Sequence, residues 1–296
     1  MTTAALVLSG CAAKPAVMFA TDSQPEHSIG TVSELADQLQ KADYVILGER
    51  HDNPEHHALQ KEVLVELYKR GWLKQVAMEM LVPSQQPGAD LAVKDRVSDL
   101  TELNTMLSWE KGWDWELYGP IVSWATSNGV PLKSANLDKG ELVTARANPA
   151  RLGNLLLGEE GVKMHKDQFK AAHCGSIPAD RAETMLRVQV GRDVRMAASL
   201  TEMKGTVLLA GSWHARKDIG VPRYVLANDP DAKILALGFT ESTEVEASNS
   251  QQYDIVWATA GVERPDYCAM FKNGTMSKGV VSKKAKAPEQ AETAQP

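Results

Sequence analysis

Short apolar runs recur along the chain, each bounded by polar residues or glycine. Runs of about four to eight apolar residues are typical of strands in a sheet that is covered on both faces. The runs predict strands over Tyr44 to Leu47, Val76 to Leu81, Thr206 to Gly211, Lys233 to Phe239 and Tyr253 to Thr259. The range 130–136 is compatible with one further strand.

Helical spacing of apolar residues lies between these runs. Thr31 to Lys41 has Leu35 and Leu39 at i, i+4 spacing, and His56 to Arg70 carries one apolar face. A strand, a helix and a second strand at this spacing favour parallel pairing, because a crossover helix joins parallel strands. The sequence therefore predicts an α/β fold, with a mainly parallel central sheet flanked by helices.

The range 85–205 is mostly helical in its apolar spacing. We interpret it as a helical subdomain inserted into an α/β domain that consists of 31–84 and 206–270. The strand near 130–136 returns briefly to the sheet. The range 278–296 has almost no apolar content, which predicts a disordered tail.

The N-terminus has an apolar segment that ends in Leu8, Ser9, Gly10 and Cys11. A small residue before a cysteine is typical of the lipidation site of bacterial lipoproteins, so we interpret 1–11 as a signal remnant with Cys11 as the lipidated residue. The range 12–30 then serves as a tether, and Ala12 favours the outer membrane. The alternative is an apolar tail with a chance cysteine.

The composition narrows the class of protein. The chain has 296 residues, of which 43% are hydrophobic and 24% are charged, and this suits a globular protein. The formal net charge of −6 argues against nucleic acid as a partner. Besides Cys11, the chain has Cys174 and Cys268, which form a disulfide in an oxidising periplasm or remain two free, buried thiols.

Candidate chemistry follows the predicted strands. Glu49 and His51 come directly after one strand, His214 follows another, and both loops have the form G-x-x-H. Glu79 interrupts a third strand, where an unpaired carboxylate would be costly to bury. Because parallel strands end at one edge, we predict that these side chains meet there and act on a bound water or bind a divalent metal. The alternative is that Glu79 pairs with Arg50 and the histidines cap helices.

Aromatic residues crowd another part of the chain. Four tryptophans and Tyr118 lie between 109 and 124, while His165 and His173 flank Phe169. Such clusters often form core. They also suit a flat apolar pocket for a planar ligand, with Tyr118, His165 or His173 as the donor to a haem iron.

These residues together resemble the ChaN family of haem-binding lipoproteins. The matching segments are Leu8 to Cys11, GERHDNPEHHALQ, AMEM, WELYGP, AHCGSIP at 172–178 and GSWHARKDIGVP at 211–222. The α/β domain of that family is similar to that of erythromycin-esterase-like and Tiki-type proteins, which share the paired G-x-x-H layout.

The resemblance implies a lipid-anchored cell-envelope protein that binds haem, takes part in haem or iron uptake and forms a homodimer around the ligand. A tyrosine on the iron is implied too, and Tyr118 is our assignment. The alternative function is a hydrolase that uses Glu49, His51, Glu79 and His214. From the sequence, the haem site and this edge site fall on different parts of the chain.

Overall fold

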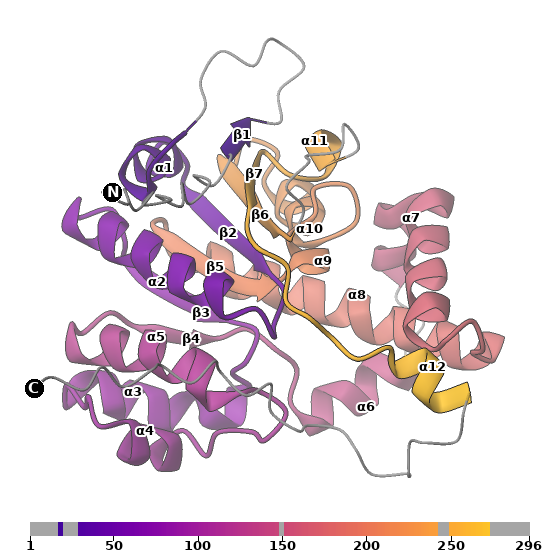
Figure 1. Ribbon diagram of the computed structural model, residues 1–296, viewed down its shortest axis with the longest axis horizontal. Helices are drawn as coiled ribbons and strands as arrows, with labels where there is room; N and C mark the ends of the chain where they lie inside the picture. The colour runs from indigo at the N-terminus through magenta and orange to yellow at the C-terminus, as the bar shows by residue number, and fades with distance from the viewer. Residues whose placement is uncertain (1–16, 20–28, 148–150, 242–248, 273–296) are drawn as a thin grey trace, which may run out of the picture.

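A central sheet organises the chain. The computed structural model describes residues 17–19, 29–147, 151–241 and 249–272. Within them the strand order is β1-β7-β6-β2-β5-β3-β4, and every pairing is parallel except that of β1 with β7. The strands are β1 (Val17–Phe19), β2 (Tyr44–Glu49), β3 (Gln75–Met78), β4 (Leu132–Ser134), β5 (Thr206–Gly211), β6 (Ile234–Thr240) and β7 (Ile255–Ala258). The predicted α/β fold is confirmed (Figure 1).

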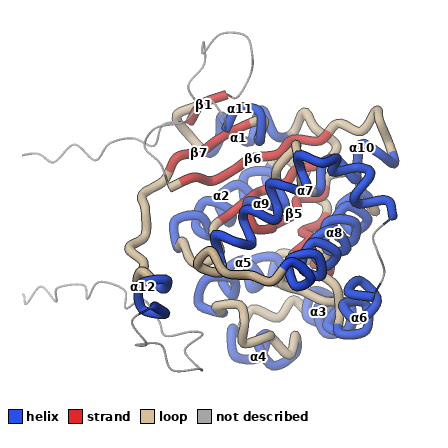
Figure 2. The backbone as a smooth tube through the Cα atoms, turned by 90° about the vertical axis from the view of Figure 1, so that its right-hand side faces the viewer, coloured by secondary structure: helices blue, strands red, loops and turns tan. Residues whose placement is uncertain are grey.

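Helices cover both faces of the sheet (Figures 1 and 2). One face carries α1 (Val32–Leu39), α2 (Pro54–Lys69), the 3-10 helix η1 (Pro83–Gln85), α3 (Gln86–Lys94), α4 (Leu100–Met106) and α5 (Trp115–Ser127). The other carries α6 (Lys139–Ala147), α7 (Arg151–Ala172), α8 (Ala179–Thr201), α9 (Ser212–Ala215) and α10 (Val221–Asn228). The short helices α11 (Asn249–Gln252) and α12 (Tyr267–Lys272) lie beside and after β7.

Two apolar cores follow from the alternation of side chains along each strand. Val45 and Leu47 of β2 belong to the core beneath α1 to α5, whereas Tyr44 and Ile46 belong to the core beneath α7 to α10. The range 85–205 is helical apart from β4. Its helices before β4 lie on one face of the sheet and those after β4 lie on the other, so both sets contribute to the main cores.

The start of α2 fixes the loop that carries His51. Asn53 has an extended backbone and its side-chain oxygen accepts a hydrogen bond from Glu55 N at 2.9 Å, while Pro54 occupies the first turn. Gly48 is required just before the loop, because a Cβ there would lie 2.6 Å from the Cβ of Ala215. The end of β2 therefore lies close to α9.

The predicted terminal segments lie mainly outside the described residues. The signal remnant 1–11 and the tail 278–296 are not described, but the predicted tether 12–30 contains β1, which pairs with β7. In the described ranges, no helix is both long and apolar enough to cross a membrane.

Candidate functional site

The edge at the carboxyl ends of β2, β5 and β3 gathers the residues predicted from the G-x-x-H loops. Glu49 ends β2 and lies in register with Gly211, which ends β5. Glu79 directly follows β3, the other neighbour of β5. His51 lies in the loop after β2, and His214 lies in α9, directly after β5. The four residues predicted for the sheet edge therefore lie close together in the structure.

Glu49 is the centre of the first half of this cluster. Its side chain is fully buried, and Tyr118 donates its hydroxyl to Glu49 Oε1 at 2.5 Å. His51 Nδ1 lies 2.9 Å from the same oxygen and 3.0 Å from the Tyr118 hydroxyl. His57 Nδ1 lies 3.2 Å from Glu49 Oε2. One carboxylate thus bonds to an imidazole and a phenol and lies close to a second imidazole.

Glu79 is the centre of the second half. It accepts a hydrogen bond from the Gly211 backbone N–H at 2.8 Å, and its Oε1 lies 3.4 Å from His214 Nε2. The opposite nitrogen of His214 lies 2.5 Å from Asp193 Oδ1. Gln189, one turn before Asp193 on α8, lies 3.1 Å from both ring nitrogens of His214. His214 is therefore held between two carboxylates.

His51 joins the two halves, because its Nε2 lies 3.8 Å from Glu79 Oε2. Acids and imidazoles then alternate in one continuous path, which we call the acid–histidine network: His57, Glu49, His51, Glu79, His214 and Asp193. The side chain of His51 is 39% exposed, while that of His214 is 6% exposed and that of Glu79 is 4% exposed. His51 is therefore the member that meets solvent or a ligand.

The network is strongly charged. Burial raises the pKa of Glu79, but His214, His51 and the Gly211 N–H outweigh it and hold that pKa well below its usual range. Burial also raises the pKa of Glu49, but His57, His51 and Tyr118 outweigh it, so that pKa is lowered. Burial lowers the pKa of His214, but Glu79 and Asp193 raise it to about 10. At neutral pH His214 is therefore a buried cation between two acids.

Gly211 allows His51 to approach β5. A Cβ at this position would lie 2.7 Å from His51 Nε2, closer than real side chains approach. The backbone of Gly211 has φ −58° and ψ 147°, which any residue can adopt. The glycine of the second G-x-x-H loop is thus required by the close contact and not by its backbone angles.

Tyr118 lies in the network and not in a separate pocket. The sequence assigned it to a haem site distant from Glu49, but α5 buries it completely against Glu49 and His51. Burial, followed by the adjacent carboxylate, raises the pKa of Tyr118 far above its usual value. The separation of the two predicted sites was therefore wrong, because α5 packs over α2 and brings the aromatic stretch to the sheet edge. Trp109 and Trp113 lie beside Tyr118, with ring centroids 5.9 and 6.1 Å away.

His165 and His173 occupy different environments, although they share α7 or its end. His165 is 1% exposed, and its ring lies 5.9 Å from that of Trp213 and 6.0 Å from that of Phe169. His173 follows the last turn of α7, where its Nδ1 lies 2.8 Å from the Phe169 carbonyl oxygen. The two histidines therefore lie on either side of Phe169, His165 against its ring and His173 against its carbonyl oxygen.

The alternative pairing of Glu79 with Arg50 is wrong. Arg50 Nε instead lies 3.7 Å from Glu241 Oε2, while Glu79 contacts His51 and His214. Among the described residues, no group of three His, Cys, Asp or Glu side chains is arranged to hold a metal ion. The carboxylates of the network contact imidazole nitrogens directly, which leaves those nitrogens engaged.

Several partners in the site were missed from the sequence. Asp193 completes the network, Gln189 contacts it at His214, and Arg264 donates two hydrogen bonds of 2.6 Å to Asp52, next to His51. Asp193 had a detectable signal, because it interrupts the otherwise apolar face of α8. Arg264 had none, since it follows the last strand in a polar connection.

The connection from β7 to α12 passes the carboxyl end of β2 (Figure 1). Its distal end is fixed by a disulfide between Cys174 and Cys268, whose Cα atoms are 5.4 Å apart. Of the two alternatives for these cysteines, the paired one is therefore correct.

Fold and site together define an α/β protein with a buried acid–histidine network at the carboxyl edge of a parallel sheet. The chain belongs to the family described as haem-binding uptake, Tiki superfamily, ChaN, whose sequence model matches residues 35–225. The predicted family is therefore confirmed, and haem is the ligand that the family description gives.

Solved structures agree with this assignment. The structure "Cofacial heme binding to ChaN of Campylobacter jejuni" superposes with a TM-score of 0.72 at 24% identity, covering 83% of this chain and 97% of that chain. At this identity the likeness concerns the fold. The type III effector HopBA1 has a TM-score of 0.46 at 14% identity, covering 78% of this chain and 94% of its own. A mutant erythromycin esterase, EreC, has a TM-score of 0.41 at 14% identity, covering 73% and 74%. Neither of these two carries further weight, and no curated protein matches significantly.

Proposed function

We propose that this chain is a lipid-anchored protein of the cell envelope that binds haem, takes part in haem or iron uptake and works as a homodimer. Membership of the haem-binding uptake family supports the ligand. The Campylobacter jejuni structure is one of cofacial heme binding to ChaN, which supports haem groups held face to face between two subunits here.

The observation that carries the haem proposal is the unpartnered Nε2 atom of His165. This atom is buried and has no hydrogen-bond partner within the described chain. Burial outweighs a backbone hydrogen bond to Ile219 and lowers the pKa of His165 to about 4, so the ring is neutral at neutral pH. A neutral imidazole nitrogen is a common ligand of haem iron.

The side chains near His165 are of kinds that bind haem. Trp213 supplies an aromatic wall, and the Arg216 guanidinium lies over its ring, with Cζ 4.7 Å from the centroid. Arg216 also contacts Met164 Sδ at 3.5 Å and pairs with Asp218. We assign His165 to the iron and Arg216 to a propionate, since guanidinium groups recognise carboxylates. Haem supplies an iron that takes a nitrogen ligand and a flat ring that stacks on aromatic side chains.

A haem titration of the Cys11→Ser chain tests the proposal by visible absorption. Saturable binding with a Soret band is expected, and His165→Ala should weaken it at least about tenfold and change the spectrum. His173→Ala is the matched control, because that ring bonds to the Phe169 carbonyl. Loss of the spectrum in Tyr118→Phe, with His165→Ala unchanged, would assign the iron to Tyr118. A response without saturation in the chain that keeps both His165 and Tyr118 would refute haem binding.

The envelope location has independent support from the Cys174–Cys268 disulfide. Disulfides form and persist in oxidising compartments such as the bacterial periplasm. Labelling with radioactive palmitate, followed by separation of inner and outer membranes, tests the anchor. The intact chain should be labelled and should fractionate with the outer membrane, while Cys11→Ser should be unlabelled and released.

A second candidate function is hydrolysis at the sheet edge. It is favoured by His51, which is exposed while its Nδ1 is oriented by the buried Glu49. An imidazole held in this way acts as a general base on water. His51→Ala should abolish any hydrolysis and leave haem binding by His165 intact. Tyr118→Phe does not separate the two functions, because Tyr118 bonds to Glu49.

A further inference from the structure

The position of β1 limits how far the body of the protein can lie from a membrane. Val17, the first residue of β1, follows Cys11 by six residues. Six residues span at most about 20 Å whatever their conformation. A lipid on Cys11 would therefore hold the β1–β7 edge of the sheet next to the bilayer, since β1 pairs with β7.

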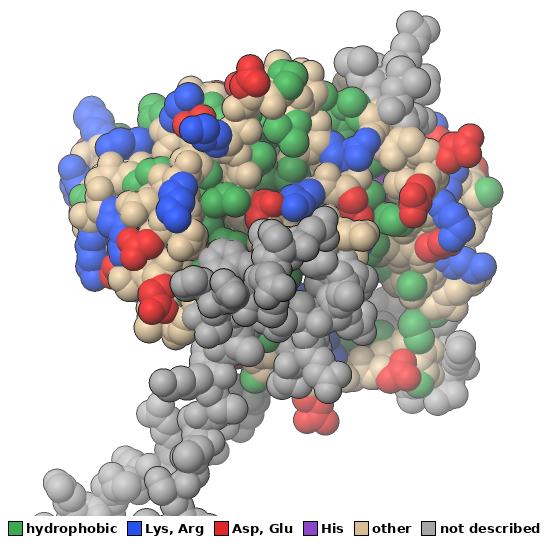
Figure 3. Space-filling view, turned by 90° about the horizontal axis from the view of Figure 1, so that it is seen from above, with side chains coloured by type: hydrophobic (Ala, Val, Ile, Leu, Met, Phe, Trp, Pro, Cys, Tyr) green, Lys and Arg blue, Asp and Glu red, His purple; other side chains and the backbone are tan. Residues whose placement is uncertain are grey.

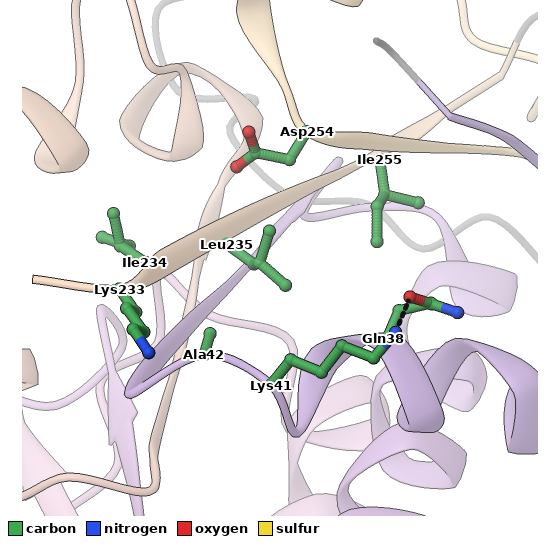
Figure 4. A pocket seen from close by; sticks show the side chains of 8 residues that line it. All are labelled: Gln38, Lys41, Ala42, Lys233, Ile234, Leu235, Asp254 and Ile255. Carbon is green, nitrogen blue, oxygen red and sulfur yellow. Dashed lines mark hydrogen bonds between the residues drawn. The ribbon is translucent and has the colours of Figure 1, made fainter. Parts of the chain in front are cut away.

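A groove lies directly beside this edge. Phe19 of β1 is in register with Ile255, and Ile255 lines a groove of ≈ 370 Å³ between α1 and the starts of β6 and β7. Figure 4 shows Leu235 and Ile255 along the floor, with Lys41 and Lys233 on the rim. Leu235 is half-buried, whereas the next four residues of β6 are buried.

The charges at the groove suit an anionic surface. The ammonium group of Lys41 donates to the neutral amide of Gln38 at 2.6 Å, and within the described ranges neither Lys41 nor Lys233 pairs with a carboxylate. The acid that lines the groove, Asp254, is paired with Lys217 at 2.8 Å. Two exposed cations therefore remain unneutralised beside apolar side chains.

We infer that the groove between α1 and β6, with Lys41 and Lys233 on its rim, faces the membrane and contacts anionic phospholipid headgroups. The inference rests on the proposed lipid anchor. On this side of the molecule lysines and arginines lie among hydrophobic and acidic side chains (Figure 3), so the electrostatic support comes from Lys41 and Lys233 at the groove itself. The sheet would then stand with its β1 edge on the bilayer and α4 pointing away (Figure 1).

Depth-dependent quenching on the full lipidated chain tests this orientation. An environment-sensitive dye is attached at Gln40→Cys, beside Lys41, or at the exposed Thr105→Cys on α4 as the matched control. The protein is bound to vesicles of phosphatidylethanolamine and phosphatidylglycerol that contain brominated lipid. The dye at position 40 should be quenched and the dye at position 105 should not.

Three further arms make the result decisive. Replacing both lysines, by Lys41→Glu and Lys233→Glu, should reduce quenching at position 40, with about a fivefold loss of headgroup affinity for each charge. Lys111→Glu is the charge control, and a long Gly/Ser insertion between Cys11 and Val17 should also abolish the difference between the dyes. Equal quenching at both positions, in protein that incorporates palmitate, would overturn the orientation and leave the anchor standing. Absence of palmitate would refute the anchor and the orientation together.

Discussion

Glu79→Gln is the substitution that most directly tests the acid–histidine network. The side chain of Glu79 is 4% exposed and contacts His214, His51 and the Gly211 N–H. Glutamine keeps the shape and can still accept the hydrogen bond from Gly211. The substitution therefore removes the charge between two imidazoles and little else.

The expected loss of stability is large. Breaking a buried ion pair by removing one charge costs about 3–5 kcal/mol, because the partner stays buried without compensation. His214 keeps Asp193 at 2.5 Å, and the introduced glutamine retains the backbone hydrogen bond from Gly211, so we expect the lower end, about 3 kcal/mol. The pKa of His214 should fall from about 10, since Glu79 is the largest contributor that raises it.

The loss should depend on pH in a defined direction. The folded-state pKa of His214 lies above its ordinary value of 6.5, so its stabilisation is complete below about pH 6.5 and is lost as pH rises towards 10. Glu79 has a lowered pKa, so its contribution is present above pH 4.5 and is lost as pH falls further. The difference between wild type and Glu79→Gln should therefore be largest near pH 5–6.5 and shrink towards pH 10.

Urea unfolding at pH 6 and pH 10, monitored by circular dichroism, measures this difference in the free energy of unfolding. Glu66→Gln is the control, since Glu66 lies at the surface, where it pairs with the exposed Lys69 and the partly buried Arg70, and should change little. A difference below about 1 kcal/mol at pH 6, or one that is equal at the two pH values, would show that Glu79 and His214 are not a charged pair in the folded protein.

Further substitutions test other contacts. Gly211→Ala should displace the exposed ring of His51 and return its pKa, which Glu49 and Glu79 hold above its usual value against burial, towards normal in an NMR titration. Gly211→Ala should lower the free energy of unfolding, measured in urea, by about 1 kcal/mol. Gly220→Ala should lower it by about 3 kcal/mol, because the new Cβ would meet a backbone oxygen. Cys268→Ser should lower the unfolding free energy by about 3–4 kcal/mol, because the bridge closes a separation of 94 residues. Arg264→Gln should cost about 1 kcal/mol and raise the lowered pKa of Asp52, whose hydrogen bond to Arg264 would be lost.

The sequence was sufficient to predict the edge of the sheet that carries the site. Apolar runs ending in glycine predicted β2 and β5, and parallel strands end at a common edge, so Glu49, His51 and His214 had to lie on one side of the molecule. Glu79 was recognisable because a charge in a buried strand requires a partner. The structure confirms that these residues are in contact.

The partners contributed by helices were harder to predict, because they depend on how each helix packs. Tyr118 lies on the apolar face of α5, so the sequence suggested a core residue or a ligand for a planar group. Its hydrogen bond to Glu49 forms only because α5 packs against α2. Asp193 similarly needs α8 to lie against β5 before it can reach His214. No spacing rule within one segment contains this information.

The order of the strands explains why the second G-x-x-H loop is indispensable. β5 comes late in the sequence, yet it lies between β2 and β3 in the sheet. Gly211 and His214 are therefore placed between Glu49, at the end of β2, and Glu79, just after β3. The family match over 35–225 ends shortly after this loop and contains the whole network, although it leaves out β6, which pairs directly with β2. The network therefore lies wholly within the matched range, whereas the groove is lined by residues at the starts of β6 and β7 together with residues at the end of α1 that the match does cover.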